Sequence, residues 1–198
     1  MDTALTIAPA GTAPALLLRA WTEDDIPAML AAHQDPLMRR WLRHPITDAV
    51  RARQVVRARQ ADGRAGTAVS FAVLETADGL PATLVGSMSI RGLGEAAATA
   101  EVGYWVASFA RGRGIAPRAL GVMCDWAFSS PRLRPLEQLH LIHSVGNQAS
   151  CRVAAKTNFA LSAVLPPLPP EFPHDGHLHV RPRTEAVQNP DPRRLSSR

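Results

Sequence analysis

The strongest constraint on the fold is a succession of three strand-like segments in the middle of the chain. They are "AVSFAVLE" (68–75), "TLVGSMSIRG" (83–92) and "TAEVGYWVA" (99–107). In the second segment, apolar residues alternate with Ser87 and Ser89, as a strand with one buried face requires. A Gly/Pro turn, "TADGLPA", separates the first two segments. The three segments therefore predict an antiparallel meander.

Helical patterns lie on both sides of this meander. Thr22 with Asp25 three residues later forms an Asp variant of the capping box, which opens an amphipathic helix. After the meander, apolar residues recur at helical spacing from Ile115 to about Ser129. The other expected elements are a strand at 15–21, helices at 35–45 and 47–61, a strand at 135–145, a helix at 147–159 and a strand at 176–181. This order predicts one α+β domain with a mixed, mostly antiparallel sheet.

Composition divides the 198 residues into a domain and two tails. We expect a flexible leader at 1–14, a folded domain at 15–183 and a disordered, basic tail at 184–198. From residue 181 onward, five arginines and two acidic residues give +3 of the formal net charge of +5. The body is therefore only +2, and a basic, Pro-rich tail is typical of solvated disorder. Nucleic acid is not an expected partner, because zinc-finger, RNP1 and bZIP patterns are lacking.

The sequence also indicates a cytoplasmic protein. No apolar run approaches the roughly 18–20 residues of a membrane span. The first residues lack the basic n-region of a secretory signal. Cys124 and Cys151 show no CxxC spacing, so we expect reduced, mostly buried thiols. We expect no membrane partner, and a homodimer stays open.

The turn "FARGRGIAPRAL" (109–120) places three arginines and two glycines between a strand and a helix. Unpaired N–H groups at a helix start, together with the helix dipole, form an anion site. Gly112 and Gly114 let the backbone approach a phosphate closely, and Arg111 and Arg113 can add charge-assisted bonds. Neither GxGxxG nor a Walker A loop fits, because position 117 is proline and GKS and GKT are lacking. The alternative is a surface turn with solvated arginines.

The context of this turn resembles a known family. The stretch "AEVGYWVASFARGRGIAPRAL" resembles the acetyl-CoA-binding core of the GNAT acetyltransferases. Their signature, Arg/Gln-x-x-Gly-x-Gly/Ala, is met by Arg111, Gly114 and Ala116. "NQASCRVAAKTNF" and "LLLRAWTEDDIPAMLAAHQDPLMRRWL" resemble segments of the ribosomal-protein N-terminal (RimJ/RimL-like) branch. The resemblance covers roughly residues 15–165.

This resemblance implies a GNAT fold with a central splay between two strands and flanking helices. It implies acetyl-CoA as the cosubstrate, with the pantetheine arm along the backbone near Val106 and against Asn147. The backbone amide near Val106 would also serve as an oxyanion donor. The residues implied to hold the pyrophosphate are Arg111, Gly112, Arg113, Gly114, Ile115 and Ala116.

The resemblance also suggests two catalytic groups. Glu101 lies on the strand that leads into the turn, where several family members carry a general base. The alternative is a glutamate that faces solvent or an arginine. Ser150 matches a serine that can act as general acid near the thiolate, although serine at a helix start is often a cap. Tyr104, the chain's one tyrosine, lies on the strand itself and is not predicted as the acid.

We predict no metal site. His177 and His179 suggest a zinc site, but a third ligand at sensible spacing is lacking. We expect Cys124 to pack in the core and Cys151 to be structural as well.

The predicted function is acetyl transfer from acetyl-CoA to a primary amine by direct attack in a ternary complex. A peptide N-terminal α-amine is the first choice of acceptor. The alternatives are a small-molecule amine, such as an antibiotic or polyamine, and a non-catalytic acyl-CoA sensor. A protein acting on RNA or ribosomes through its basic tail is a further alternative.

The acceptor is the least determined part of this prediction. After Phe159 the Pro-rich segment "LSAVLPPLPPEFPHDG" replaces the short strand of the family, and Asn158 stands where glycine is usual. In relatives that region borders the acceptor cleft. The helical segment with Trp41 and its neighbours Arg39, Arg40 and Arg43 borders it as well.

Overall fold

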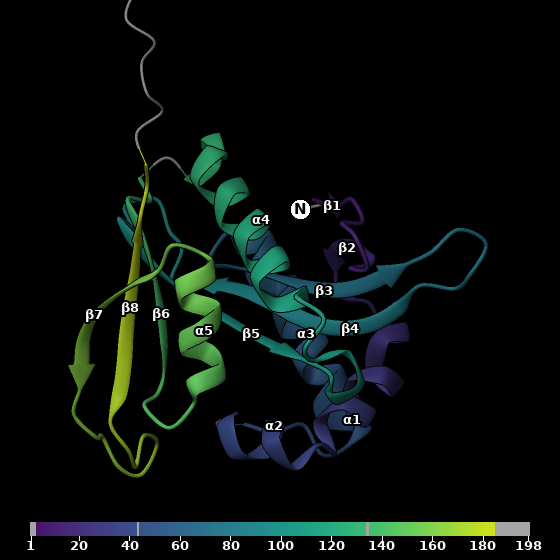
Figure 1. Ribbon diagram of the computed structural model, residues 1–198, viewed down its shortest axis with the longest axis horizontal. Helices are drawn as coiled ribbons and strands as arrows, with labels where there is room; N and C mark the ends of the chain where they lie inside the picture. The colour runs from purple at the N-terminus through teal and green to yellow at the C-terminus, as the bar shows by residue number, and fades with distance from the viewer. Residues whose placement is uncertain (1–2, 43, 134, 185–198) are drawn as a thin grey trace, which may run out of the picture.

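The computed structural model describes residues 3–42, 44–133 and 135–184. Their strands form one eight-stranded sheet in the order β1-β2-β3-β4-β5-β6-β8-β7 (Figure 1). All neighbours pair antiparallel except β5 and β6, which are parallel. The strands are β1 (Leu5–Ile7), β2 (Ala15–Ala20), β3 (Ala68–Thr76), β4 (Thr83–Arg91), β5 (Thr99–Val106), β6 (Gln138–Ser144), β7 (Ala160–Leu165) and β8 (Gly176–Pro182). The predicted α+β class and the meander β3–β4–β5 are confirmed.

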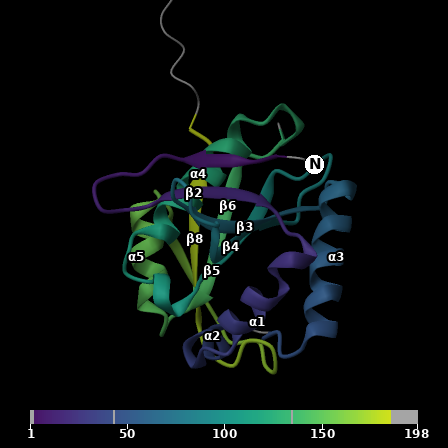
Figure 2. The same cartoon turned by 90° about the vertical axis from the view of Figure 1, so that its right-hand side faces the viewer.

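Helices cover both faces of the sheet (Figures 1 and 2). One face carries α1 (Ile26–His33), α2 (Pro36–Trp41) and α3 (Ala49–Ala65), and the other carries α4 (Ile115–Ser129) and α5 (Gln148–Lys156). The short 3-10 turns are Glu23–Asp25, Ser108–Ala110 and Pro131–Leu133. Asp35 and Asp48 cap α2 and α3 through their carboxylates. Within the described residues, no helix is long and apolar enough to cross a bilayer.

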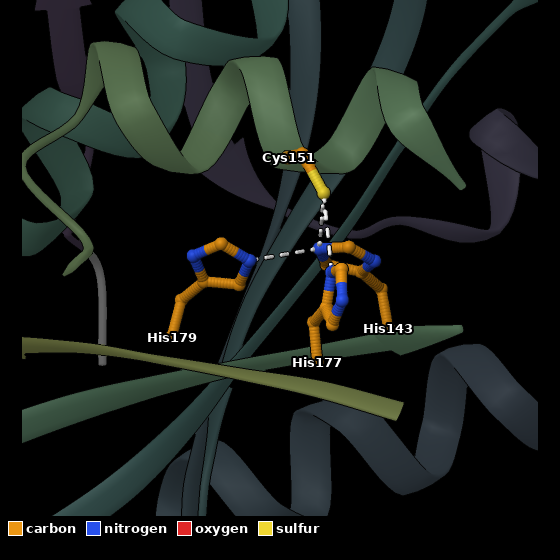
Figure 3. Close-up of side chains that lie close together, drawn as sticks. All are labelled: His143, Cys151, His177 and His179. Atoms are coloured by element: carbon orange, nitrogen blue, oxygen red, sulfur yellow. Dashed lines mark hydrogen bonds between the residues drawn. The ribbon is translucent and has the colours of Figure 1, made fainter. Parts of the chain in front are cut away.

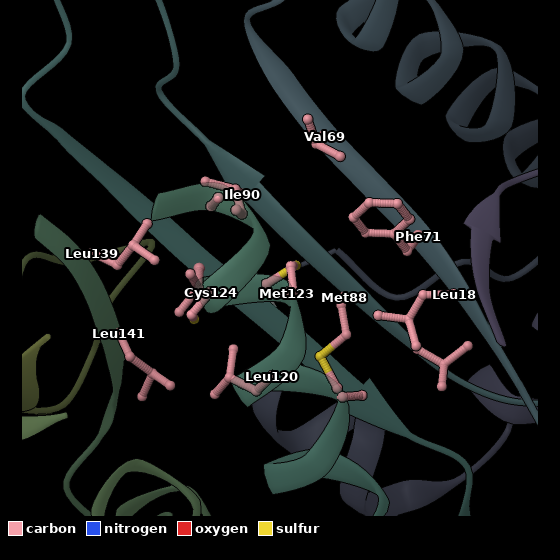
Figure 4. Packing of buried hydrophobic residues seen from close by; sticks show 14 of the residues in the cluster. Leu18, Val69, Phe71, Met88, Ile90, Leu120, Met123, Cys124, Leu139 and Leu141 are labelled. Atoms are coloured by element: carbon pink, nitrogen blue, oxygen red, sulfur yellow. The ribbon is translucent and has the colours of Figure 1, made fainter. Parts of the chain in front are cut away.

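Two apolar cores lie on the two faces of the sheet. The core under α4 packs Leu120 and Met123 of that helix against Phe71 and Met88 of the sheet (Figure 4). The core under α1–α3 packs residues such as Trp105 of β5. Because side chains alternate along a strand, β5 contributes residues to both cores.

The predicted leader is partly wrong. Leu5–Ile7 forms β1, which pairs antiparallel with Leu16–Leu18 of β2. The Arg118 guanidinium in the first turn of α4 donates to the carbonyls of Ala8 and Pro14, at 2.6 and 2.7 Å. The N-terminal residues therefore belong to the sheet and brace α4. The other predicted tail lies, from residue 185 onward, outside the described residues.

A second correction concerns the segment after Phe159. The sequence shows no evident strand there, whereas β7 forms at Ala160–Leu165 and pairs with β8. Most of its side chains are exposed, so the apolar alternation that marks a half-buried strand is weak.

The sheet opens between β5 and β6. Their parallel pairing runs only from Thr99–Gln138 to Val102–Leu141. Beyond this point β5 stays paired with β4 and β6 stays paired with β8, so β5 and β6 diverge (Figure 1). The predicted central splay is therefore confirmed, and among the residues that the structure describes, no strand pairs with the facing backbone edges of β5 and β6 beyond this point.

Candidate active site

The Gly-rich turn lies where β5 ends and α4 begins. Gly112 and Gly114 have φ of 76° and 73°, in the left-handed region that favours glycine. Gly114 is the N-cap of α4, and the first helical residue, Ile115, is buried. The N–H groups of this first turn lack intrahelical partners and carry the positive end of the helix dipole. The turn therefore provides a backbone anion site.

Arg111 and Arg113 of the turn pair with carboxylates. Arg113 forms a bidentate ion pair with Glu75 of β3, at 2.7 and 2.9 Å. Arg111 forms an ion pair with Asp35, and its Nε donates to the Val106 carbonyl at 3.2 Å. These contacts fasten the turn to the sheet and to the start of α2. With both side chains paired in this way, the groups of the turn that can bind an anion are its backbone N–H groups. Direct contacts between the Arg111 and Arg113 guanidinium groups and a phosphate stay a prediction.

Val106 lies at the mouth of the splay. It pairs with Gly86 of β4, and the short 3-10 turn Ser108–Ala110 leads from it into the Gly-rich turn. A Cβ added at Gly86 would lie 2.6 Å from the Trp105 carbonyl oxygen, so glycine allows β4 to approach β5 closely here. The edge of β5 that leads to the anion site is thus held in place from its β4 side.

Ser150 and Tyr104 form a hydrogen-bonded pair on the α4–α5 side of the splay. Their hydroxyl oxygens lie 2.9 Å apart, and Ser150 is only 8% exposed. The Asn147 side-chain oxygen caps α5 by accepting the Ser150 N–H at 3.2 Å. Burial raises the pKa of Tyr104, so its hydroxyl keeps its proton at neutral pH.

Sequence reasoning did not single out Tyr104, which the structure places within hydrogen-bond reach of Ser150. The signal that identifies it is strand alternation, because Ala100, Val102 and Tyr104 of β5 share the face toward α4 and α5. What the sequence does not show is that α5 packs on this face and brings Ser150 there.

Glu101 and Ser150 are not brought together. Glu101 alternates with Tyr104 along β5 and so faces the α1–α3 side of the sheet. Its carboxylate pairs with Arg91 of β4 at 2.6 Å, and the two side chains are 37% and 52% exposed. This is the ion pair that the sequence analysis left open as an alternative, and catalysis by Glu101 stays a prediction.

A buried histidine lies on the same face as Glu101. His33, at the end of α1, is 3% exposed and packs edge-on against Trp105, with ring centroids 5.6 Å apart. Its Nδ1 accepts the Ile46 N–H at 3.0 Å, which assigns the proton to Nε2. Loss of hydration lowers its pKa to about 4, so the ring is neutral at pH 7.

A cavity of about 490 Å³ lies at the β6 side of the splay. It joins α2, the end of β6 and the Pro-rich segment. The resemblance places α2 and the Pro-rich segment beside the acceptor. Arg39 instead donates to Gln34 at 2.6 Å, and Arg43 lies outside the described residues. The lining includes Arg40, Trp41, Ser144, Gly146, Pro167 and Asp175.

Comparison with known families identifies the chain. Residues 15–160 match the family model for the acetyltransferase (GNAT) domain. The chain belongs to this family. The prediction of an acetyl-CoA-dependent acetyltransferase is thereby confirmed at the level of the family.

Solved structures of acetyltransferases share its fold. RimL, a ribosomal alpha-N-protein acetyltransferase in complex with coenzyme A, has a TM-score of 0.74 and 22% identity, covering 90% of this chain and 98% of RimL. The microcin self-immunity acetyltransferase MccE, in complex with acetyl-CoA and AMP, has a TM-score of 0.73 and 16% identity, covering 87% and 93%. RimJ of Mycobacterium smegmatis, in complex with CoA-disulfide, has a TM-score of 0.72 and 23% identity, covering 88% and 85%.

At these identities the likeness shows the fold and leaves the acceptor open. No curated protein matches the chain by sequence. The acceptor of this GNAT acetyltransferase must therefore be argued from its own cavity and splay.

One further cluster in this GNAT chain corrects the sequence analysis. His177 and His179 do have neighbouring ligand groups, because His143 and Cys151 lie beside them (Figure 3). The two added residues come from β6 and α5, so sequence spacing does not reveal them.

Proposed function

We propose that the chain transfers the acetyl group of acetyl-CoA to the free α-amine of a peptide or protein N-terminus, by direct attack in a ternary complex. The cavity beside the splay carries this proposal. Its volume of about 490 Å³ is within the range of small-ligand sites and suits the first residues of a peptide chain. The similarity in fold to RimL, named as a ribosomal alpha-N-protein acetyltransferase, supports the same acceptor class.

The residues at the turn and the splay fit acetyl-CoA. The backbone N–H groups of 111–116 would bind the pyrophosphate, because both positive-φ glycines leave open space above the turn. The free edge of β5 near Val106 would pair with the amide groups of the pantetheine arm as an added strand does. Asn147 uses its oxygen to cap α5, so its Nδ2 would donate to the arm from the α5 side.

Tyr104 and Ser150 would supply the proton that the reaction requires. The amine nitrogen forms a bond to the thioester carbon, and the carbon–sulfur bond breaks with the electron pair on sulfur. Ser150 would donate its hydroxyl proton to this thiolate and take one from Tyr104, whose phenolate would regain a proton from solvent as the products leave. The backbone N–H near Val106 would hold the oxyanion of the intermediate.

Glu101 is our candidate for the base that removes the amine proton, directly or through water. Glu101 faces the side of the sheet opposite Ser150, so the base and the acid would act from the two sides of the splay. Replacing Glu101 by Gln should lower kcat at least tenfold, whereas Arg91→Gln, which breaks the same ion pair, should not. If the chain is a non-catalytic sensor, both variants will bind acetyl-CoA, and neither they nor the wild type will show acetyl transfer.

The first test is calorimetric titration of acetyl-CoA into the wild-type protein and Gly114→Asp. The introduced carboxylate would repel the pyrophosphate, so saturable binding should be lost in the variant. Gly79→Asp is the matched control, because Gly79 has a φ of 74° and equally open space above it. If folded wild-type protein does not bind, or if both variants bind alike, the assignment of the turn to the cofactor is wrong.

The acceptor is tested with peptides that offer only one kind of amine. A peptide with a free N-terminus and no lysine should gain one acetyl group, detected by mass spectrometry. The same peptide with a blocked N-terminus and an internal lysine should not react, and neither should a polyamine. Faster turnover of the polyamine would instead favour the small-molecule alternative.

We also propose a cytoplasmic location. Cys124 and Cys151 are both free thiols, as is usual in a reducing compartment.

A further inference from the structure

Four side chains from three elements converge near α5. They are His143 of β6, Cys151 of α5, and His177 and His179 of β8. One ligand atom from each lies within 4.8 Å of the others. Figure 3 shows the Cys151 sulfur pointing down from the helix toward the three imidazole rings, which rise from the strands.

The distances between these atoms match a tetrahedral metal site. Cys151 Sγ lies 3.3 Å from His177 Nδ1 and 3.7 Å from His143 Nε2. The Nε2 atoms of His143 and His179 are 3.2 Å apart. A tetrahedral Zn²⁺ with ordinary bond lengths separates two nitrogens by about 3.3 Å, and nitrogen from sulfur by about 3.6 Å. Three of the six edges of the tetrahedron thus already have about the right length, and the other pairs of ligand atoms lie within 4.8 Å.

The hydrogen bonds of the His143 and His179 rings leave the Nε2 lone pair of each ring facing the other. His143 Nδ1 lies 2.9 Å from the Ser144 carbonyl, and His179 Nδ1 lies 3.4 Å from the Phe159 carbonyl. A carbonyl only accepts, so each Nδ1 carries the proton and each Nε2 keeps a lone pair. Two facing lone pairs repel each other unless a cation lies between them. A backbone carbonyl on the far nitrogen is also the usual support of a metal-bound histidine.

We propose that His143, Cys151, His177 and His179 bind one zinc-class divalent transition metal ion in a tetrahedral Cys-His₃ site. Four protein ligands close the coordination sphere, which is typical of a structural site. Cys151 binds as the thiolate, and its proton is released to solvent when the metal enters. The imidazoles bind in their neutral form.

The metal would position the catalytic helix. Cys151 directly follows Ser150, and the other three ligands lie on β6 and β8. A metal bond to Cys151 therefore fastens the first turn of α5 to these strands and holds Ser150 at Tyr104. The proposal rests on the four side chains and does not depend on the acetyl acceptor.

The test uses the full chain without a histidine tag, stripped of metal by a chelator and titrated with Co²⁺. Tetrahedral Co²⁺ absorbs strongly in the visible range, and a thiolate ligand adds a charge-transfer band in the near ultraviolet. We expect both bands to saturate at one Co²⁺ per chain, to disappear when Zn²⁺ is added, and to be accompanied by proton release.

Variants identify the ligands. Cys151→Ala should remove the thiolate band, and His177→Ala should weaken Co²⁺ affinity about 100-fold or more. Cys124→Ala and His140→Ala are the matched controls, since Cys124 is the other cysteine and His140 lies on β6 outside the cluster. Both controls should keep the spectrum. Zn²⁺ should also raise the Tm of wild-type protein but not that of His177→Ala.

The wild-type titration decides the matter if a variant fails to fold. A stripped, folded wild-type protein that gives no tetrahedral Co²⁺ spectrum would overturn the proposal. So would a thiolate band that Cys151→Ala retains. Neither result would affect the proposed acetyl transfer, which is followed with acetyl-CoA alone.

Discussion

At the scale of single residues, burial determines the protonation state of the Tyr104 hydroxyl and the His33 ring. Tyr104 of β5 is partly buried, Ser150 of α5 is buried, and their hydroxyl groups form a hydrogen bond of 2.9 Å. Burial keeps the tyrosine hydroxyl protonated, so the pair stores a proton next to the splay. A serine alone is a poor acid in water, and in the proposed mechanism the neighbouring phenol would supply the replacement proton.

This pair yields the first prediction. If Ser150 and Tyr104 deliver one proton in sequence, Ser150→Ala and Tyr104→Phe should each lower kcat about 100-fold. The double variant should lose little more than the worse single variant, because residues that act as a unit are not additive. Steady-state kinetics at saturating acetyl-CoA measure the effect, and calorimetry verifies that acetyl-CoA still binds. Fully multiplicative losses would mean that the two hydroxyls act independently.

His33 yields a prediction about pH and stability. Its pKa is about 4 in the folded chain against 6.5 in the unfolded chain. Between these values the unfolded chain binds a proton that the folded chain does not, so stability falls as pH falls from 6.5 to 4. The largest loss from this residue is about 3 kcal/mol.

Urea unfolding at several pH values measures this dependence. His33→Asn keeps an oxygen to accept the Ile46 N–H and removes the titration. The variant should be less stable at pH 7 but should lose less stability on acidification than the wild type. Equal slopes for the two proteins would remove His33 as the cause.

At the scale of elements, periodicity predicts those that bury one face and misses those that do not. The meander β3–β4–β5 and the helix α4 show clear periods, and both form where the sequence predicts them. The three residues of β1 are too few for a period, and β7 is mostly exposed. Such edge strands are determined by their neighbours, which a local pattern does not contain.

The contact between β4 and β5 yields the element-scale prediction. Gly86→Ala would place a Cβ 2.6 Å from the Trp105 carbonyl oxygen, so the strands must separate beside Val106. We expect a stability loss of about 1–3 kcal/mol and weaker binding of acetyl-CoA. Gly94→Ala is the control, because nothing lies within 4 Å of its added Cβ. Thermal unfolding and calorimetry check both effects, and unchanged acetyl-CoA affinity would show that the strand edge does not carry the cofactor.

At the scale of the whole molecule, the site depends on contacts between distant segments. Asp35 holds Arg111 of the turn, and three histidines meet Cys151 across α5, β6 and β8. Each of these residues can be read from the sequence, but no regular spacing in the sequence predicts which residue it contacts. The family resemblance therefore singles out the Gly-rich turn and Ser150, whereas the four-residue cluster and the contact between Tyr104 and Ser150 require the folded chain.

The two ends of the chain make the last prediction. The sequence predicts that both 1–14 and 184–198 are tails. Side chains of β1 nevertheless pack against the core, and the Ala8 carbonyl accepts a hydrogen bond from Arg118 in the first turn of α4. Removing residues 1–12 should expose the edge of β2 and loosen α4, the helix that follows the Gly-rich turn. We expect a loss of about 2–3 kcal/mol from the partly buried side chains and the hydrogen bond, and weaker binding of acetyl-CoA.

Removing residues 185–198 is the matched deletion at the other end. If this segment is the disordered tail that its composition predicts, its loss should leave both the Tm and the acetyl-CoA affinity unchanged. For a chain of this size, about 2–3 kcal/mol corresponds to a fall in Tm of roughly 4–12 °C, so thermal unfolding separates the two deletions clearly. Equal Tm values would mean that β1 adds nothing to the stability of the sheet. A lower Tm for the C-terminal deletion alone would show that the basic segment packs on the domain.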